Sequence, residues 1–194
     1  MASRRSSKRP GALLLFPGAG SAASHPSLTA IEQAVAPLPV CRADFPYRRE
    51  GRRAPDRVPK LLASVLEEAD ALVASAGIAP AQLVLGGRSM GGRMCSIAVA
   101  DGLPAAALVL IAYPLHPPGK PDRLRVEHFP RLTVPCLFVS GTRDPFGTPT
   151  ELEAHTAAIP GPVTHVWIDG GRHDLKGADA RIAAVVADWI RSVR

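Results

Sequence analysis

Short apolar runs alternate along the chain with segments whose apolar residues recur every three or four positions. The runs have the length of strands and are bounded by proline or glycine. They predict strands over residues 12–16, within 37–45, and over 83–85, 107–112, 136–139 and 163–168. Because the runs are continuously apolar, they are typical of a mostly parallel sheet covered by helices on both faces.

The most regular amphipathic segment lies between the second and third predicted strands. Its apolar residues, from Val58 to Ala76, follow the i, i+3, i+4, i+7 spacing of one helix face. We expect Asp56 to cap its start, Gly77 to cap its end and Pro80 to prevent its continuation. Further helices are predicted over about 26–36, around 94–102, from the capping box Thr148–Glu151 onwards, and around 182–193.

Length and composition are those of one soluble globular domain. The chain has 194 residues, of which 46% are hydrophobic and 21% charged, which excludes disordered, collagen-like and coiled-coil chains. We expect a flexible basic tail over residues 1–10 and a single domain over 11–194. The longest apolar run, 105–113, is too short to span a membrane, and 12–16 is too short for the core of a signal peptide.

Cysteine usage and charge bear on location and partners. Cys41, Cys95 and Cys136 include no CxxC pair and suit buried free thiols in a reducing compartment, so we expect a cytoplasmic protein. The net charge of +6 is concentrated in residues 1–9 and 42–60. No nucleic-acid-binding motif surrounds these basic residues, so a nucleic acid partner is not expected.

The clearest chemical signal follows the third predicted strand. Gly87-Arg88-Ser89-Met90-Gly91 matches the G-x-S-x-G nucleophile elbow. A serine on a sharp turn from strand to helix has a strained backbone, so the residues two positions away must lack side chains. Ser89 would then lie at a helix N-terminus, where amide groups stabilise a developing oxyanion.

A base and an acid are expected where later strands end. Asp144 follows the strand over 136–139 and His173 follows the strand over 163–168, in the chain order serine, acid, histidine. Asp174 directly follows His173 and would have to turn back to reach its ring. We therefore predict Asp144 as the acid and His173 as the base.

The loop after the first predicted strand, Pro17-Gly-Ala-Gly20, supplies the remaining groups. Its small residues allow a backbone N–H to reach a substrate oxygen; we assign this donor to Ala19, within one residue, and the second donor to Met90. The loop lacks the third glycine and the later acidic residue of a dinucleotide site. The residues expected to line the substrate site are Gly18, Gly20, His25 and Arg88.

Together these motifs resemble the α/β-hydrolase family. The stretches that carry the resemblance are Phe16-Pro-Gly-Ala-Gly20 with His25-Pro26, Phe45-Pro-Tyr47 with Arg52-Arg-Ala-Pro55, Gly86-Gly-Arg-Ser-Met-Gly-Gly92, Tyr113-Pro-Leu-His-Pro-Pro-Gly119, Gly141-Thr-Arg-Asp144 and Gly170-Gly-Arg-His173. The chain is most similar to the small capless branch related to dienelactone hydrolases. Within that branch it resembles the predicted hydrolases grouped with a testis-expressed protein and a non-specific-lethal chromatin-complex subunit.

The resemblance implies a three-layer, minimal capless α/β-hydrolase fold of about six strands that lacks the first two strands of the family. It also implies Ser89 as nucleophile, Asp144 as acid and His173 as base, with no metal or organic cofactor. Dienelactone hydrolases carry a cysteine nucleophile where this chain has Ser89, so their substrate does not carry over. The loop that begins Phe16-Pro-Gly also departs from the usual His-Gly type.

These features predict a serine hydrolase, carboxylesterase-like, that cleaves a carboxylic ester or a related small acyl substrate through an acyl-enzyme. A non-catalytic interaction module that keeps the fold is the alternative, and the complete set of three residues argues against it. We expect a small-molecule partner, no membrane partner, and a monomer or homodimer. The arginines at 48, 49, 52 and 53 suggest a preference for acidic substrates.

Overall fold

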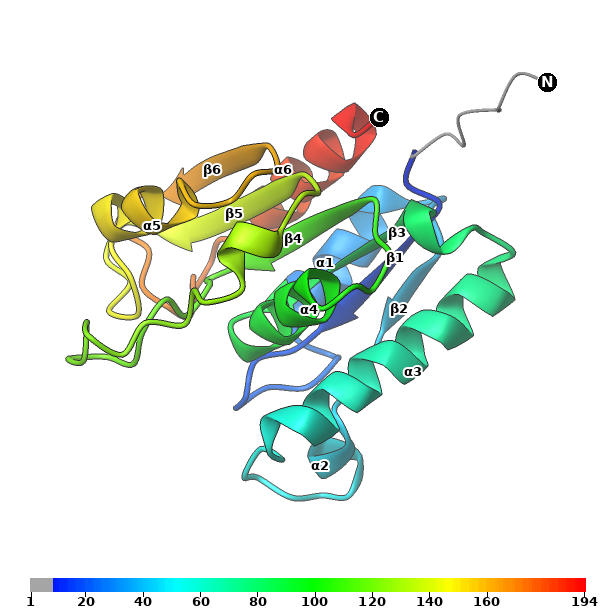
Figure 1. Ribbon diagram of the computed structural model, residues 1–194, viewed down its shortest axis with the longest axis horizontal. Helices are drawn as coiled ribbons and strands as arrows, with labels where there is room; N and C mark the ends of the chain where they lie inside the picture. Colours follow the sequence, from blue (N-terminus) through cyan, green and yellow to red (C-terminus); the bar gives the residue numbers. More distant parts are fainter. Residues whose placement is uncertain (1–8) are drawn as a thin grey trace.

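A six-stranded sheet forms the centre of the molecule in the computed structural model, which describes residues 9–194 (Figure 1). Its strands are β1 (Ala12–Phe16), β2 (Val40–Arg42), β3 (Leu83–Arg88), β4 (Ala107–Ile111), β5 (Cys136–Gly141) and β6 (Val163–Ile168). The spatial order is β2-β1-β3-β4-β5-β6 and every neighbouring pair is parallel. The predicted sheet is confirmed, with a fully parallel arrangement. The predicted basic tail lies, over residues 1–8, outside the described residues.

Helices cover both faces of this sheet. On one face α1 (Pro26–Val35) packs beside α6 (Asp179–Ser192), and on the other α3 (Val58–Ala76) packs beside α4 (Met90–Ala100). The shorter α5 (Pro149–Thr156) contacts β6 near the sheet edge. The three-layer α/β-hydrolase architecture expected from the sequence is therefore present.

The two faces of the sheet explain why its strands are continuously apolar. In β1, Leu13 and Leu15 belong to the core beneath α1 and α6, whereas Leu14 and Phe16 belong to the core beneath α3 and α4. All four are fully buried. Burying a side chain of this size contributes about 1.5–3 kcal/mol, so the two cores hold the strand ends in fixed positions.

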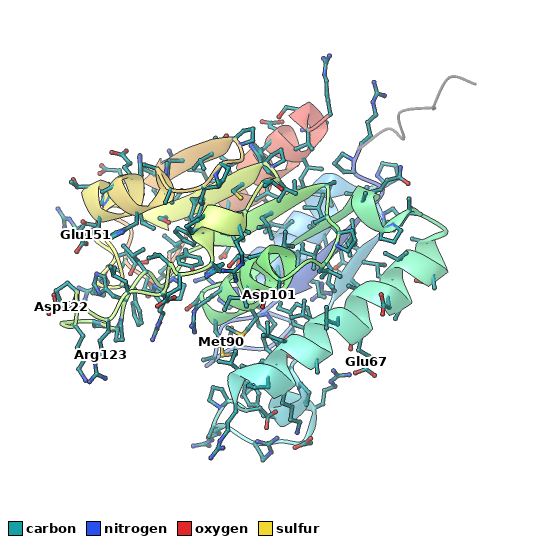
Figure 2. All side chains as sticks on the ribbon, in the orientation of Figure 1. Glu67, Met90, Asp101, Asp122, Arg123 and Glu151 are labelled. Carbon is teal, nitrogen blue, oxygen red and sulfur yellow. The ribbon has the colours of Figure 1, made fainter. Side chains whose placement is uncertain are left out.

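Most of the predicted boundary signals are confirmed. Gly77 caps α3 with φ +64°, and Thr148 and Glu151, the latter labelled in Figure 2, form the predicted capping box of α5. The cap assigned to Asp56 is wrong. The residue before α3 is Arg57, whose side chain makes no capping hydrogen bond. The Asp56 carboxylate is not available as a cap because it pairs with Arg52 at 2.8 Å.

Three short elements have no counterpart in the sequence prediction: α2 (Pro46–Arg49) and the 3₁₀ turns Pro80–Gln82 and Phe129–Arg131. All are shorter than the window in which helical periodicity can be detected. Two of the three cysteines are buried free thiols, as predicted, while Cys41 is only partly buried. From residue 9 to residue 194, no helix combines the length and apolarity needed to cross a membrane.

Candidate active site

Ser89 occupies the sharp turn between β3 and α4. Its φ of +45° and ψ of −114° are strained for a residue with a side chain, and its N–H donates to the carbonyl of Ile111 at 2.8 Å. A Cβ at Gly87 or Gly91 would collide with the carbonyl oxygen of Phe16. The glycines of the motif are therefore required by the close approach of the β1 backbone.

The three residues predicted as nucleophile, base and acid lie in one hydrogen-bonded line. The Nε2 atom of His173 is 2.9 Å from the Ser89 hydroxyl, and its Nδ1 atom is 2.8 Å from Oδ2 of Asp144. The Asp144 side chain is 1% exposed, and its Oδ1 atom also accepts the N–H of Phe146 at 2.8 Å. These contacts orient the carboxylate towards the imidazole on the side opposite Ser89.

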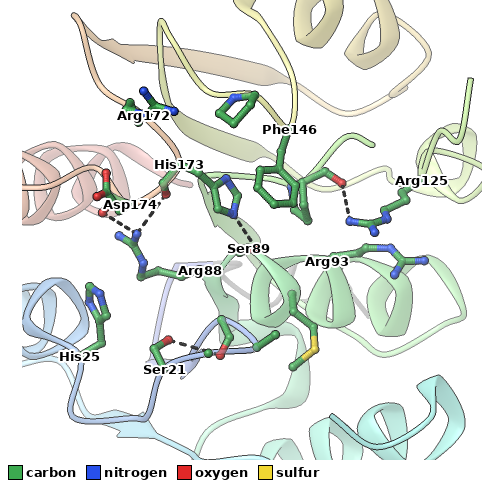
Figure 3. Close-up of a pocket in the computed structure, with 16 residues that line it drawn as sticks. Ser21, His25, Arg88, Ser89, Arg93, Arg125, Phe146, Arg172, His173 and Asp174 are labelled. Carbon is green, nitrogen blue, oxygen red and sulfur yellow. Dashed lines mark hydrogen bonds between the residues drawn. The ribbon is translucent and has the colours of Figure 1, made fainter. Parts of the chain in front are cut away.

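Two further residues hold the His173 loop. The Phe146 ring stacks on the imidazole, with ring centroids 3.9 Å apart. The buried guanidinium of Arg88 donates to the carbonyl oxygens of His173 at 3.3 Å and Asp174 at 2.8 Å (Figure 3). Burial lowers the pKa of Arg88, but an arginine remains charged. Arg88 lines the pocket, and it also ties β3 to the loop of the predicted base.

The glycine loop after β1 lies against Ser89. A Cβ on Gly18 would lie 3.5 Å from that of Ser89. The carbonyl of Gly18 accepts the N–H of Ser21 at 3.1 Å. Because the peptide between Gly18 and Ala19 is trans, the N–H of Ala19 points away from Ser21, in the direction opposite to that carbonyl. The hydroxyl of Tyr47 donates to the carbonyl of Ala19 at 2.7 Å and fixes the next peptide.

His25 caps α1 and lines the pocket. Its Nδ1 atom accepts the N–H of Ser27 at 3.2 Å and lies 2.9 Å from the Ser27 hydroxyl. Burial, followed by the charge of Arg88, lowers the pKa of His25. The imidazole is therefore neutral, with its remaining proton on Nε2.

The predicted residues surround a pocket of about 740 Å³. Its lining includes Gly18, Ala19, Gly20, His25, Arg88, Ser89, Met90 and His173. The arginines at 48, 49, 52 and 53, which the sequence suggested for acidic substrates, are absent from this lining. Arg49 instead pairs with Glu68 at 3.0 Å, and Arg52 with Asp56.

Sequence reasoning missed several residues of the pocket. Phe146 lies in the loop after Asp144 and lines the pocket. Tyr47, in the unpredicted α2, is buried outside the lining and holds the carbonyl of Ala19. Arg93, one helical turn after Ser89, and Arg125 also line the pocket. The helical spacing could have indicated Arg93, whereas nothing in the sequence places Arg125 beside it. Across the described part of the chain, no group of three or more His, Cys, Asp or Glu side chains is arranged to hold a metal ion.

Comparison with known proteins gives one family and many similar folds. The alpha/beta hydrolase domain family matches residues 9–188. Est1E of Butyrivibrio proteoclasticus, solved with ferulic acid bound, superposes with a TM-score of 0.74 at 13% identity, over 98% of this chain and 92% of that one. An alpha-beta serine hydrolase homologue from Coxiella burnetii superposes with a TM-score of 0.73 at 16% identity, over 93% of this chain and 85% of that one. A dienelactone hydrolase from Anabaena variabilis superposes with a TM-score of 0.73 at 18% identity, over 96% of this chain and 88% of that one. At these identities the structures establish the fold alone.

Proposed function

The chain belongs to the alpha/beta hydrolase domain family, and from this premise we propose that it is a serine hydrolase that cleaves a carboxylic ester or a related small acyl substrate. The observation that carries the proposal is the line of hydrogen bonds from Ser89 through His173 to the buried Asp144. This arrangement activates a serine hydroxyl in proteins of unrelated folds. The narrower branch suggested by the sequence motifs remains a prediction.

In the proposed reaction, Nε2 of His173 takes the proton of Ser89 as Oγ bonds to the substrate carbonyl carbon. His173 then gives that proton to the leaving alcohol as the ester C–O bond breaks, which leaves an acyl group on Ser89. A water molecule, deprotonated by His173, releases the acid and restores the serine. Asp144 holds the imidazole in the tautomer that keeps Nε2 free to accept the proton.

The amides of Ala19 and Met90 are the proposed donors to the oxyanion. Met90 is the first residue of α4, where backbone N–H groups have no acceptor within the helix. The peptide of Ala19 is held by the bonds to Ser21 and Tyr47 described above. Donors fixed in advance stabilise a developing negative charge without having to reorganise.

The proposal is tested by reaction with a fluorophosphonate probe, which modifies activated serines. Covalent labelling of the native protein, together with turnover in a panel of esters, supports a serine hydrolase. A folded protein that neither labels nor turns over any ester would favour the non-catalytic interaction module.

We predict a preference for short acyl chains. The lining of the pocket includes the charged side chains of Arg88, Arg93 and Arg125, and each methylene buried in an apolar tunnel would contribute about 0.8 kcal/mol that such a lining does not supply. Acetyl to butyryl esters are expected to give higher kcat/KM than dodecanoyl esters. A steady rise in kcat/KM from C2 to C12 would contradict this.

Arg88 is predicted to position His173. Arg88→Met removes the bonds to the carbonyls of His173 and Asp174, and a displaced base lowers kcat by roughly tenfold to a hundredfold. KM should change little, and Arg88→Lys should recover part of kcat. A rise in KM at unchanged kcat would instead assign Arg88 to substrate binding, the role expected from the sequence.

A further inference from the structure

Two arginines lie next to one another in the wall of the pocket. Arg93 comes from α4 and Arg125 from the segment between β4 and β5, and Figure 3 shows them together on one side of Ser89, with Arg88 and His25 on the other side. Both are partly buried. A pair of like charges in such a position is unfavourable unless an anion compensates it.

No carboxylate of residues 9–194 pairs with either of them. The Nε atom of Arg93 is buried and has no hydrogen-bond partner. The Arg125 guanidinium makes one side-chain hydrogen bond, a long one of 3.5 Å to the carbonyl of Pro114. By contrast, arginines elsewhere on the molecule do find carboxylates, as Arg42 with Glu32 and Arg131 with Asp101 show.

The positive charge of Arg93 contributes to lowering the pKa values of two neighbouring side chains. Burial, and next the charge of Arg93, lower the pKa of Arg125. The same two causes, in the same order, lower the pKa of His128 to about 4, so His128 is neutral at pH 7. This side of the pocket therefore carries positive charge without a built-in counter-ion.

Helix geometry places the backbone of Arg93 close to that of Ser89. The N–H of Arg93 donates to the carbonyl of Ser89 at 3.0 Å, so the two residues are one helical turn apart on the same side of α4. Four residues along a helix span about 6 Å. A group held by Arg93 would thus be a few bonds from a carbonyl carbon attacked by Ser89.

We propose that Arg93 and Arg125 bind a carboxylate on the acyl part of the substrate, so that the preferred substrates are half-esters of short dicarboxylic acids. This inference rests on the proposed function. The two coplanar oxygens of a carboxylate match the N–H groups of a guanidinium, and Arg93 and Arg125 both line the pocket. The reaction is ordinary hydrolysis: one water is consumed, the alcohol is released, and the bound carboxylate is unchanged.

The test compares two substrates that differ only in charge. Ethyl hydrogen glutarate carries a carboxylate, and ethyl glutaramate replaces it with a neutral amide of the same size. Hydrolysis of each is followed by proton release in a pH-stat. The native protein is expected to show about tenfold to a hundredfold higher kcat/KM for the glutarate half-ester, as for hydrogen bonds between charged groups.

Arg93→Gln and Arg125→Gln should each remove most of this preference, measured as the ratio of kcat/KM for ethyl hydrogen glutarate to kcat/KM for ethyl glutaramate. Arg93→Lys should keep part of it, because the charge remains. The matched control is Arg123→Gln, an exposed arginine of the same segment outside the pocket lining, which should change neither rate.

The outcomes separate this inference from the proposed function. If both substrates are hydrolysed at equal rates, the carboxylate site is wrong although the protein is a hydrolase. If neither is hydrolysed and no fluorophosphonate labels the protein, the proposed function itself fails. Stronger inhibition of ethyl glutaramate hydrolysis by inorganic phosphate than by glutarate would overturn the choice of a carboxylate.

Discussion

Replacing Ser89 with alanine is expected to lower kcat for short-chain ester hydrolysis by at least about 10³-fold. The substitution removes the Ser89 hydroxyl, which lies 2.9 Å from Nε2 of His173. Among the described residues, it is the only hydroxyl that forms a hydrogen bond with this nitrogen. The amides proposed to bind the oxyanion would remain, so substrate binding should be largely retained and the loss should appear in kcat.

Ser24→Ala is the matched control for this variant. Ser24 is an exposed serine in the loop before α1 and is absent from the lining of the pocket. Its removal should leave the ester turnover at the native rate. Native turnover in Ser89→Ala, by contrast, would show that another residue is the nucleophile.

A second large effect is expected from Asp144→Asn, a fall in kcat of at least about 10²-fold. The amide cannot stabilise the imidazolium of His173 as the carboxylate does, and its N–H₂ group favours the wrong tautomer; in a well-studied triad this costs about 10⁴ in kcat. Asparagine has nearly the same shape and can still accept the N–H of Phe146. The thermal unfolding midpoint should therefore remain near that of the native protein.

Asp174→Asn tests whether the correct carboxylate has been assigned. Asp174 is exposed, and its side chain accepts only the N–H of Lys176, at 3.3 Å, among the contacts within residues 9–194. Losing its charge should cost less than about tenfold in kcat, since it affects His173 only indirectly. Greater damage from Asp174→Asn than from Asp144→Asn would reverse the assignment of the acid.

The sheet and its main helices were predictable because each is encoded locally. The buried run of β1 and the amphipathic spacing of α3 are patterns within one segment, and so is the cap at Gly77. The cap at Asp56 was predicted wrongly because its carboxylate is attracted by Arg52, a contact set by how the loop folds. Short elements such as α2 leave too little periodicity to detect.

The meeting of the candidate residues at the strand ends was also predictable, since parallel strands bring their carboxyl ends to one edge. Ser89, Asp144 and His173 are thus brought together although the chain separates them widely. The arginines of the pocket were not predictable in the same way. Clusters of charge in the sequence drew attention to residues 48–53, but the unpaired charge at the site comes from Arg93 and Arg125, which meet only in the folded chain.

Mass spectrometric mapping of the fluorophosphonate adduct tests the central claim most directly. The native protein is treated with the probe, digested, and its modified peptide sequenced. The account predicts a single adduct on Ser89, which disappears in Ser89→Ala and persists in Ser24→Ala. An adduct on a different residue, or a folded native protein with no adduct after long exposure, would contradict it.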